Sequence, residues 1–207
     1  MNPVSSYQDF MEFLQYSRDN NNKLIPIALI KPSVMLYLNR EHFLEHIFDY
    51  FDNRSGKSIQ FFLPGYAHYP DTAFTNILAD VRPYNENAIA LTTRRLGKIY
   101  YSEKDFIGFI EKLEDGYSKF FYRGDTELIF LKYIAGEEYN LGRFDFSKLY
   151  RYNLSKIFYS QKYYGLDEHS RLHYIENFLE DVILIIREAG TNEEKLIASI
   201  DSCYSKC

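Results

Sequence analysis

The chain lacks tryptophan and has only two cysteines, Cys203 and Cys207, among its 207 residues. Both cysteines lie near the C-terminus and neither has a partner elsewhere, so no disulfide framework is expected. A zinc site would need two further ligands close to this CxxxC pair, and a reduced tail is the simpler interpretation. The longest continuous apolar stretch, residues 182–186, is far shorter than the roughly 20 residues that span a membrane. We therefore expect a fold without disulfides, a metal or a membrane span.

An excess of basic charge is also missing. The 24 lysines and arginines are outnumbered by 29 aspartates and glutamates, which gives a net charge of −5. Because proteins that bind nucleic acid along their length are usually basic, nucleic acid is not the expected partner of the whole chain. The N-terminus lacks the basic-then-apolar pattern of a signal peptide. Together with the reduced cysteines, this pattern predicts a cytoplasmic protein.

Hydrophobic residues are plentiful, at 46% of the chain, and they include 20 tyrosines and 17 phenylalanines. A chain of this length can bury roughly 70% of its unfolded surface in one core. We therefore predict a single domain, in which residues 1–135 contain the sheet and residues 143–207 form a helical region packed on it. The many tyrosines fit either half-buried core positions or an aromatic contact surface.

Alternating apolar runs and helical periodicities suggest an α/β fold. Strands are predicted at residues 24–30, 58–63, 88–93 and 126–133, with a short fifth strand at residues 99–101. Helices are predicted to begin near residues 5, 43, 72, 102, 167 and 191, and no strand is expected after residue 133. This order favours a mostly parallel sheet of four to five strands flanked by helices, a Rossmann-like three-layer sandwich with a helical C-terminal region.

The phosphate-binding and catalytic motifs of common enzyme families are missing or incomplete. Gly56-Lys57-Ser58 matches only the end of GxxxxGK[ST], and the predicted order of helix then strand is the reverse of a P-loop. The GxGxxG fingerprint of dinucleotide folds and the GxSxG nucleophile elbow do not occur. The sequence therefore leaves open whether the protein is an enzyme, and it points to no cofactor.

Four of the five histidines form two HxxxH pairs, His42 with His46 and His169 with His173. This spacing places both imidazoles on one helical face, as in many metal sites. Both pairs lie opposite the apolar stripes of their predicted helices, and no third ligand follows at a fixed spacing. Solvated helix faces are the preferred interpretation, and no metal site is predicted.

The strongest candidate site is the carboxyl edge of the predicted sheet, where ligands bind in open α/β folds. Tyr66, His68 and Asp71 follow the strand at residues 58–63, and Arg94 and Arg95 follow the strand at residues 88–93. Paired arginines grip a carboxylate or phosphate bidentately, and a histidine oriented by an aspartate can exchange a proton. We therefore predict a pocket for a small anionic ligand, with nucleotides as one candidate class.

A structural interpretation of the same residues stays open. Proline, glycine, tyrosine and aspartate are ordinary turn residues. The two arginines then belong to a solvated hairpin turn that joins residues 88–93 to residues 98–101. In that case the arginines have no ligand to bind.

Residues 148–164 combine four basic residues and six aromatic residues with no acidic residue. Cations and aromatic rings are the ingredients of single-stranded nucleic-acid binding, but the acidic whole chain disfavours that partner. The same spacing fits a helix with a buried tyrosine stripe and lysine side chains along its outer face. A third interpretation is a surface that binds another protein, because tyrosine and arginine are enriched at interface centres. A non-catalytic interaction subunit is therefore the alternative functional prediction.

Overall fold

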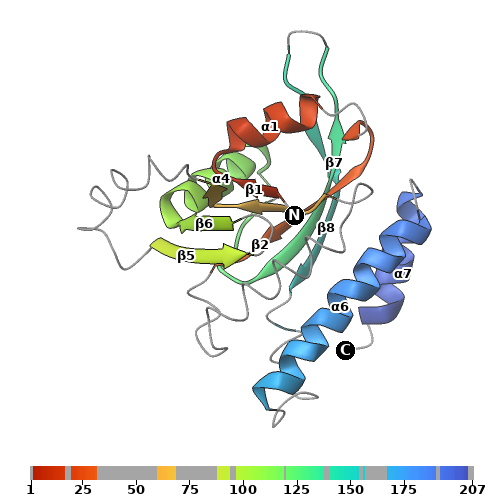
Figure 1. Ribbon diagram of the computed structural model, residues 1–207. Helices are drawn as coiled ribbons and strands as arrows, with labels where there is room; N and C mark the ends of the chain where they lie inside the picture. The colour runs from red at the N-terminus through yellow and green to blue at the C-terminus, as the bar shows by residue number, and fades with distance from the viewer. Residues whose placement is uncertain are drawn as a thin grey trace.

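The computed structural model describes residues 2–16, 20–31, 60–68, 88–93, 97–118, 120–137, 140–153, 156, 167–189 and 192–204 (Figure 1). These residues form two β-sheets and four α-helices. The strands are β1 (Asn2–Val4), β2 (Leu24–Leu29), β3 (Phe62–Pro64), β4 (Tyr66–His68), β5 (Ala88–Thr93), β6 (Gly97–Ser102), β7 (Glu127–Ile134) and β8 (Arg143–Asn153). The helices are α1 (Tyr7–Tyr16), α4 (Glu103–Gly116), α6 (Glu168–Ala189) and α7 (Glu193–Tyr204).

The larger sheet has five strands in the order β1-β3-β2-β7-β8. The strands β1, β3 and β2 run parallel to one another. β7 pairs antiparallel with β2 along the whole of β2, and β8 pairs antiparallel with β7. The long ladders are therefore the antiparallel ones, and the sheet is mixed.

The predicted mostly parallel sheet is wrong, although the α/β character is confirmed. Parallel pairing was inferred from the alternation of strands and helices, which constrains strand direction only when both strands belong to one sheet. Here the strand before α4 is β6, which belongs to the second sheet. The chain that leaves α4 is therefore free to enter the larger sheet antiparallel to β2, and the Rossmann-like strand order does not form.

The smaller sheet has three strands in the order β4-β6-β5, with both pairs antiparallel. It is joined to the larger sheet at Gly65, which lies between β3 and β4. The amide of Gly65 donates to the carbonyl of Val4 at 2.9 Å, and its carbonyl accepts from the amide of Ser102 at 2.7 Å. Gly65 has φ +81°, and a Cβ there would lie 2.6 Å from Cβ of Phe106. Only glycine fits both this backbone conformation and this close approach.

The helix starts follow from capping side chains. Ser102 caps α4, since its Oγ accepts the amide of Asp105 at 3.3 Å, and the sequence predicts a helix to begin at this position. At α1, where the sequence predicts a helix to begin near residue 5, the capping side chain is that of Ser6. Ser6 Oγ accepts the amide of Asp9 at 3.0 Å, and Ser5 Oγ instead donates to the Asp9 carboxylate at 2.5 Å. Ser5 and Ser6 are adjacent, and the sequence pattern alone does not show which of them caps the helix.

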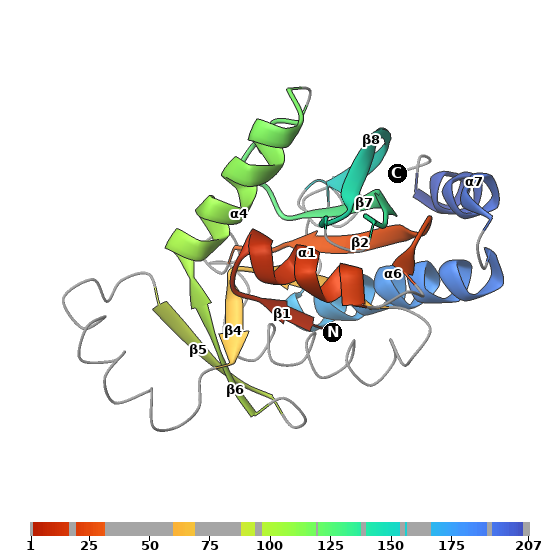
Figure 2. The same ribbon diagram turned by 90° about the horizontal axis from the view of Figure 1, so that it is seen from above.

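Helices lie on both faces of the larger sheet, because successive β7 side chains point to opposite sides. The Tyr133 hydroxyl donates to Gln15 of α1 at 2.8 Å, whereas Lys132 pairs with Glu193 of α7 at 2.5 Å. The same alternation places the buried Phe10 ring of α1 against Phe144. Figures 1 and 2 show α1 and α4 on one side and α6 and α7 on the other.

β8 is the main element that the sequence did not predict. Residues 143–153 were expected to begin a helical region, but they pair with β7 along their length, with a register shift after Leu131. The tyrosines of this segment satisfy a period of two as well as a helical one, so periodicity did not separate the two states. The described helices include none long and apolar enough to cross a membrane.

Candidate functional site

The two segments predicted to form a site leave the smaller sheet at the same end of its strands. β4 and β5 both run antiparallel to β6, so they run parallel to each other. His68 at the end of β4 and Leu91 near the end of β5 are both paired with Ile99 of β6. The chain therefore leaves β4 and β5 on the same side, with one strand between the two exits. Two strand spacings correspond to roughly 10 Å.

The described part of the predicted site consists of two residues, Tyr66 and His68. Tyr66 is completely buried, and its hydroxyl donates to the carbonyl of Ile30 at 3.2 Å. Burial is the main cause that raises the pKa of Tyr66 above its ordinary value. These contacts are those of a core residue. His68 is the last residue of β4.

Asp71, Arg94 and Arg95 lie outside the described residues, so their part in a ligand site stays a prediction. The hairpin that was the alternative for this region is confirmed in its strand pairing. Thr93 pairs with Gly97, and both arginines belong to the short connection between these two residues. A hairpin connection and a ligand contact are compatible, because turn residues at a strand end are available for binding.

The carboxyl edge of the parallel strands carries a pair of charges that the sequence did not single out. Lys31 follows β2, and its Nζ lies 3.1 Å from Oε1 of Glu103 in the first turn of α4. The same ammonium lies 5.6 Å from the centre of the Phe106 ring. Both side chains keep some exposed surface. Applying the carboxyl-edge rule to the first strand as well as the second would have identified Lys31.

Tyrosine rings lie next to Phe106, the ring that Lys31 contacts. The ring of Tyr101 lies 5.1 Å from that of Tyr66 and 5.9 Å from that of Phe106, and Phe106 also contacts Tyr122. Tyr101 is 4% exposed, and its hydroxyl has no hydrogen-bond partner among the described residues. Burial, with the nearby Glu103 carboxylate second, raises the pKa of Tyr101. Because its pKa is raised, this hydroxyl stays neutral and does not act as a base.

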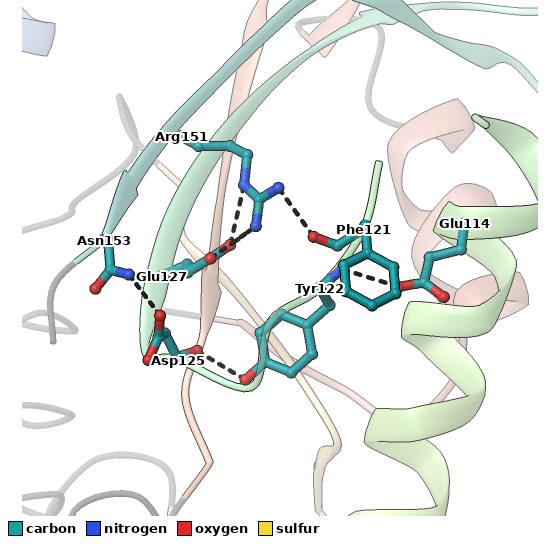
Figure 3. Close-up of polar contacts among 7 residues, drawn as sticks. All are labelled: Glu114, Phe121, Tyr122, Asp125, Glu127, Arg151 and Asn153. Carbon is teal, nitrogen blue, oxygen red and sulfur yellow. Dashed lines mark hydrogen bonds and ion pairs between the residues drawn. The ribbon is translucent and has the colours of Figure 1, made fainter. Parts of the chain in front are cut away.

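A second polar cluster lies where β7 begins and β8 ends (Figure 3). The Arg151 guanidinium forms a bidentate pair with Glu127, with its Nη2 at 2.7 and 2.6 Å from the two carboxylate oxygens. Arg151 also donates to the carbonyl of Phe121 at 3.0 Å and lies 5.1 Å from the centre of the Phe120 ring. Glu127 is only 3% exposed. The ion pair therefore connects β7, β8 and the chain that follows α4.

The remaining contacts of this cluster hold the chain between α4 and β7. The amide of Tyr122 donates to Glu114 at 2.9 Å, and its hydroxyl donates to the carbonyl of Asp125 at 2.7 Å (Figure 3). Asn153 of β8 donates to the Asp125 carboxylate at 2.6 Å. Each charged group of the cluster has a partner within it, and these contacts join α4, the segment before β7, and β8. No sequence signal identified it, because the Arg151 pair depends on the unpredicted β8.

The described residues include no group of three or more histidine, cysteine or acidic side chains that could hold a metal ion. Of the two predicted HxxxH pairs, His42 and His46 lie outside the described residues. His173 is exposed, and its Nδ1 lies 3.7 Å from the Glu176 carboxylate one helical turn away. The Gly56-Lys57-Ser58 segment also lies outside the described residues.

The aromatic and basic segment at residues 148–164 is described only in part. Residues 148–153 belong to β8, so the helical interpretation is wrong for them. Tyr152 contacts Phe130, and its hydroxyl donates to Asp201 of α7 at 3.2 Å. Residues 154–155 and 157–166 lie outside the described part of the chain.

A search for proteins similar to this chain finds no match among family models, curated proteins or solved structures.

Proposed function

We propose that the protein binds a small anionic ligand at the edge of the smaller sheet where β4 and β5 end. The observation that supports this proposal is the common direction of β4 and β5, with His68 and Leu91 both paired with Ile99. Because of this register, the segment that carries Asp71 and the segment that carries Arg94 and Arg95 both start from the same end of the smaller sheet. We also propose that the protein works in the cytoplasm, where its cysteines stay reduced.

The chemistry of these residues favours an anion such as a phosphate or a nucleotide. Two adjacent guanidinium groups offer several donors in a planar arrangement that matches phosphate and carboxylate oxygens. His68 adds a ring N–H group that can donate to the same ligand. Asp71 orients this histidine and limits the site to ligands that tolerate one carboxylate.

The proposal is tested by thermal unfolding in the presence of inorganic phosphate, nucleotides and sugar phosphates. A ligand at one hundred times its Kd stabilises the folded state by about 2.7 kcal/mol. For a chain of this size that free energy raises Tm by roughly 5–10 °C. Changing both Arg94→Ala and Arg95→Ala is expected to abolish the shift, because both guanidinium groups are lost.

The matched control is Arg123→Ala, which removes an exposed arginine of the segment before β7. This variant should keep the full ligand-induced shift. The proposal is wrong if every ligand leaves Tm unchanged. It is also wrong if the double arginine variant responds to the ligand as the unchanged protein does.

A second candidate function is binding to another protein through the C-terminal half. One observation favours it. β8 is the last strand of the larger sheet, and it carries the described part of the tyrosine-rich segment. Among the described residues no strand pairs with its outer edge, and such an edge is a common route to association between chains.

A further inference from the structure

The outer edge of β8 presents backbone groups that the described fold does not use. β8 is the last strand in the order β1-β3-β2-β7-β8, and it pairs only with β7 within that order. Among the described residues, no backbone hydrogen bond joins residues 149–153 to any element other than β7. Figure 2 shows β8 at the outer margin of the sheet, on the side away from β1. Unpaired N–H and C=O groups along such an edge can pair with a strand from another chain.

The sequence of this edge is complementary to itself. Residues 149–153 read Leu-Tyr-Arg-Tyr-Asn. If two copies pair antiparallel with Arg151 at the two-fold axis, Tyr150 of each copy lies opposite Tyr152 of the other. Aromatic pairs directly opposite each other stabilise antiparallel strands. Tyr150 and Tyr152 are both half-buried, so each keeps surface that a neighbour can cover.

The central residue does not oppose this pairing. Two arginines opposite each other would ordinarily repel. Arg151, however, forms its bidentate pair with Glu127 of β7, on the inner side of β8. Its charge is therefore balanced within its own chain, and its side chain leans away from the outer edge.

We infer that the partner of the β8 edge is a second copy of this chain. Two five-stranded sheets then join through residues 149–153 into one continuous ten-stranded sheet with a two-fold axis at Arg151. This inference rests on the second proposed function and is independent of the anion site. Because only a short strand segment pairs, the interface is small and the dimer forms in a concentration-dependent way.

Sedimentation equilibrium over a range of protein concentrations tests the inference. The unchanged chain is expected to approach twice the monomer mass as the concentration rises. Tyr150→Lys or Tyr150→Glu removes both tyrosine pairs and places like charges diagonally across the two-fold axis. Each variant alone should associate about tenfold more weakly. A one-to-one mixture of the two variants should recover association, because Lys and Glu then lie on that diagonal.

Matched controls are Tyr16→Lys and Tyr16→Glu, which place the same charges on an 87% exposed tyrosine of α1. Both should dimerise as the unchanged chain does. Amide hydrogen exchange of residues 149–153 in the unchanged chain requires no variant, and protection there should rise with protein concentration. A monomer at every concentration with concentration-independent exchange would overturn the inference. So would a dimer that both Tyr150 variants leave intact.

Discussion

Replacing Arg151 with alanine should destabilise the protein severely, because it leaves Glu127 charged and buried without a partner. Glu127 is 3% exposed, and the described contacts of its carboxylate are the hydrogen bonds from Arg151. The substitution also removes the donor to the carbonyl of Phe121 and the cation that lies over Phe120. The segment before β7 therefore loses an attachment to β8 as well as a charge partner.

The expected loss is about 3–5 kcal/mol, the usual cost of removing one partner of a buried ion pair. Arg151→Lys should cost less than alanine but more than an exposed substitution, since an ammonium cannot reproduce the bidentate geometry. Replacing both partners with apolar residues, Arg151→Met with Glu127→Leu, should cost less than Arg151→Ala alone. No charge is then left buried, and such replacements are often neutral.

Urea-induced unfolding, followed by far-ultraviolet circular dichroism, measures these differences. Arg143→Ala is the matched control, because Arg143 is an exposed arginine at the start of the same strand. That control should change the free energy of unfolding by less than about 0.5 kcal/mol. A loss of less than about 1 kcal/mol for Arg151→Ala would show that the fold does not depend on this ion pair. A double apolar variant less stable than Arg151→Ala would show that the unpaired Glu127 is not the cause of the loss.

Three further predictions concern glycines and tyrosines. Gly65→Ala should destabilise the fold by about 2 kcal/mol or more, because its Cβ would meet Phe106 in a left-handed backbone conformation. Gly108→Ala, in the interior of α4 with open space around it, should stabilise by about 0.5–1 kcal/mol in the same unfolding assay. The pKa is raised above the ordinary tyrosine value of 10.0 in the folded state for four buried or half-buried tyrosines, Tyr66, Tyr101, Tyr122 and Tyr152. Just above pH 10 these tyrosines therefore ionise in the unfolded state but not in the folded state, so the free energy of unfolding should fall as the pH rises. Absorbance at 295 nm should show that these four tyrosines ionise only as the protein unfolds. Their ionisation at pH 10 in the folded state would contradict the prediction.

Local sequence patterns predicted many of the elements that the structure describes. The apolar run at residues 24–30 forms β2, and the periodic segments after residues 102 and 167 form α4 and α6. These segments are long or capped by identifiable side chains, so local chemistry determines their state. Short elements were less well predicted, as the run at residues 58–63 shows: its end forms β3, and the chain after Gly65 continues as β4.

Strand direction and strand pairing could not be predicted from the same patterns. The segment at residues 126–133 has the expected composition of a strand, but nothing local indicates that it pairs antiparallel with β2. That choice depends on β6, which pairs with β4 and β5 in a separate sheet. The Arg151–Glu127 pair depends in turn on the pairing of β7 with β8. Each of these features follows from contacts between residues far apart in the chain.

The sequence predicted the candidate site only in outline. The rule that ligands bind beyond strand ends placed Tyr66, His68, Asp71, Arg94 and Arg95 together, and the register of β4 and β5 is compatible with a common edge. The sequence could not show that Tyr66 is completely buried, because tyrosine occurs equally at surfaces and in cores. Lys31 was missed for a different reason, because the carboxyl-edge rule was not applied to the predicted strand at residues 24–30.

Amide chemical shifts measured during a titration with inorganic phosphate, and then with a nucleotide, test the proposed anion site most directly. We expect the largest changes on His68 and on residues 91–98, at the end of the smaller sheet where β4 and β5 end. Those changes should disappear in the variant that carries both Arg94→Ala and Arg95→Ala. Changes that instead centre on β8 or α6, or no changes at saturating ligand, would show that the anion does not bind where β4 and β5 end.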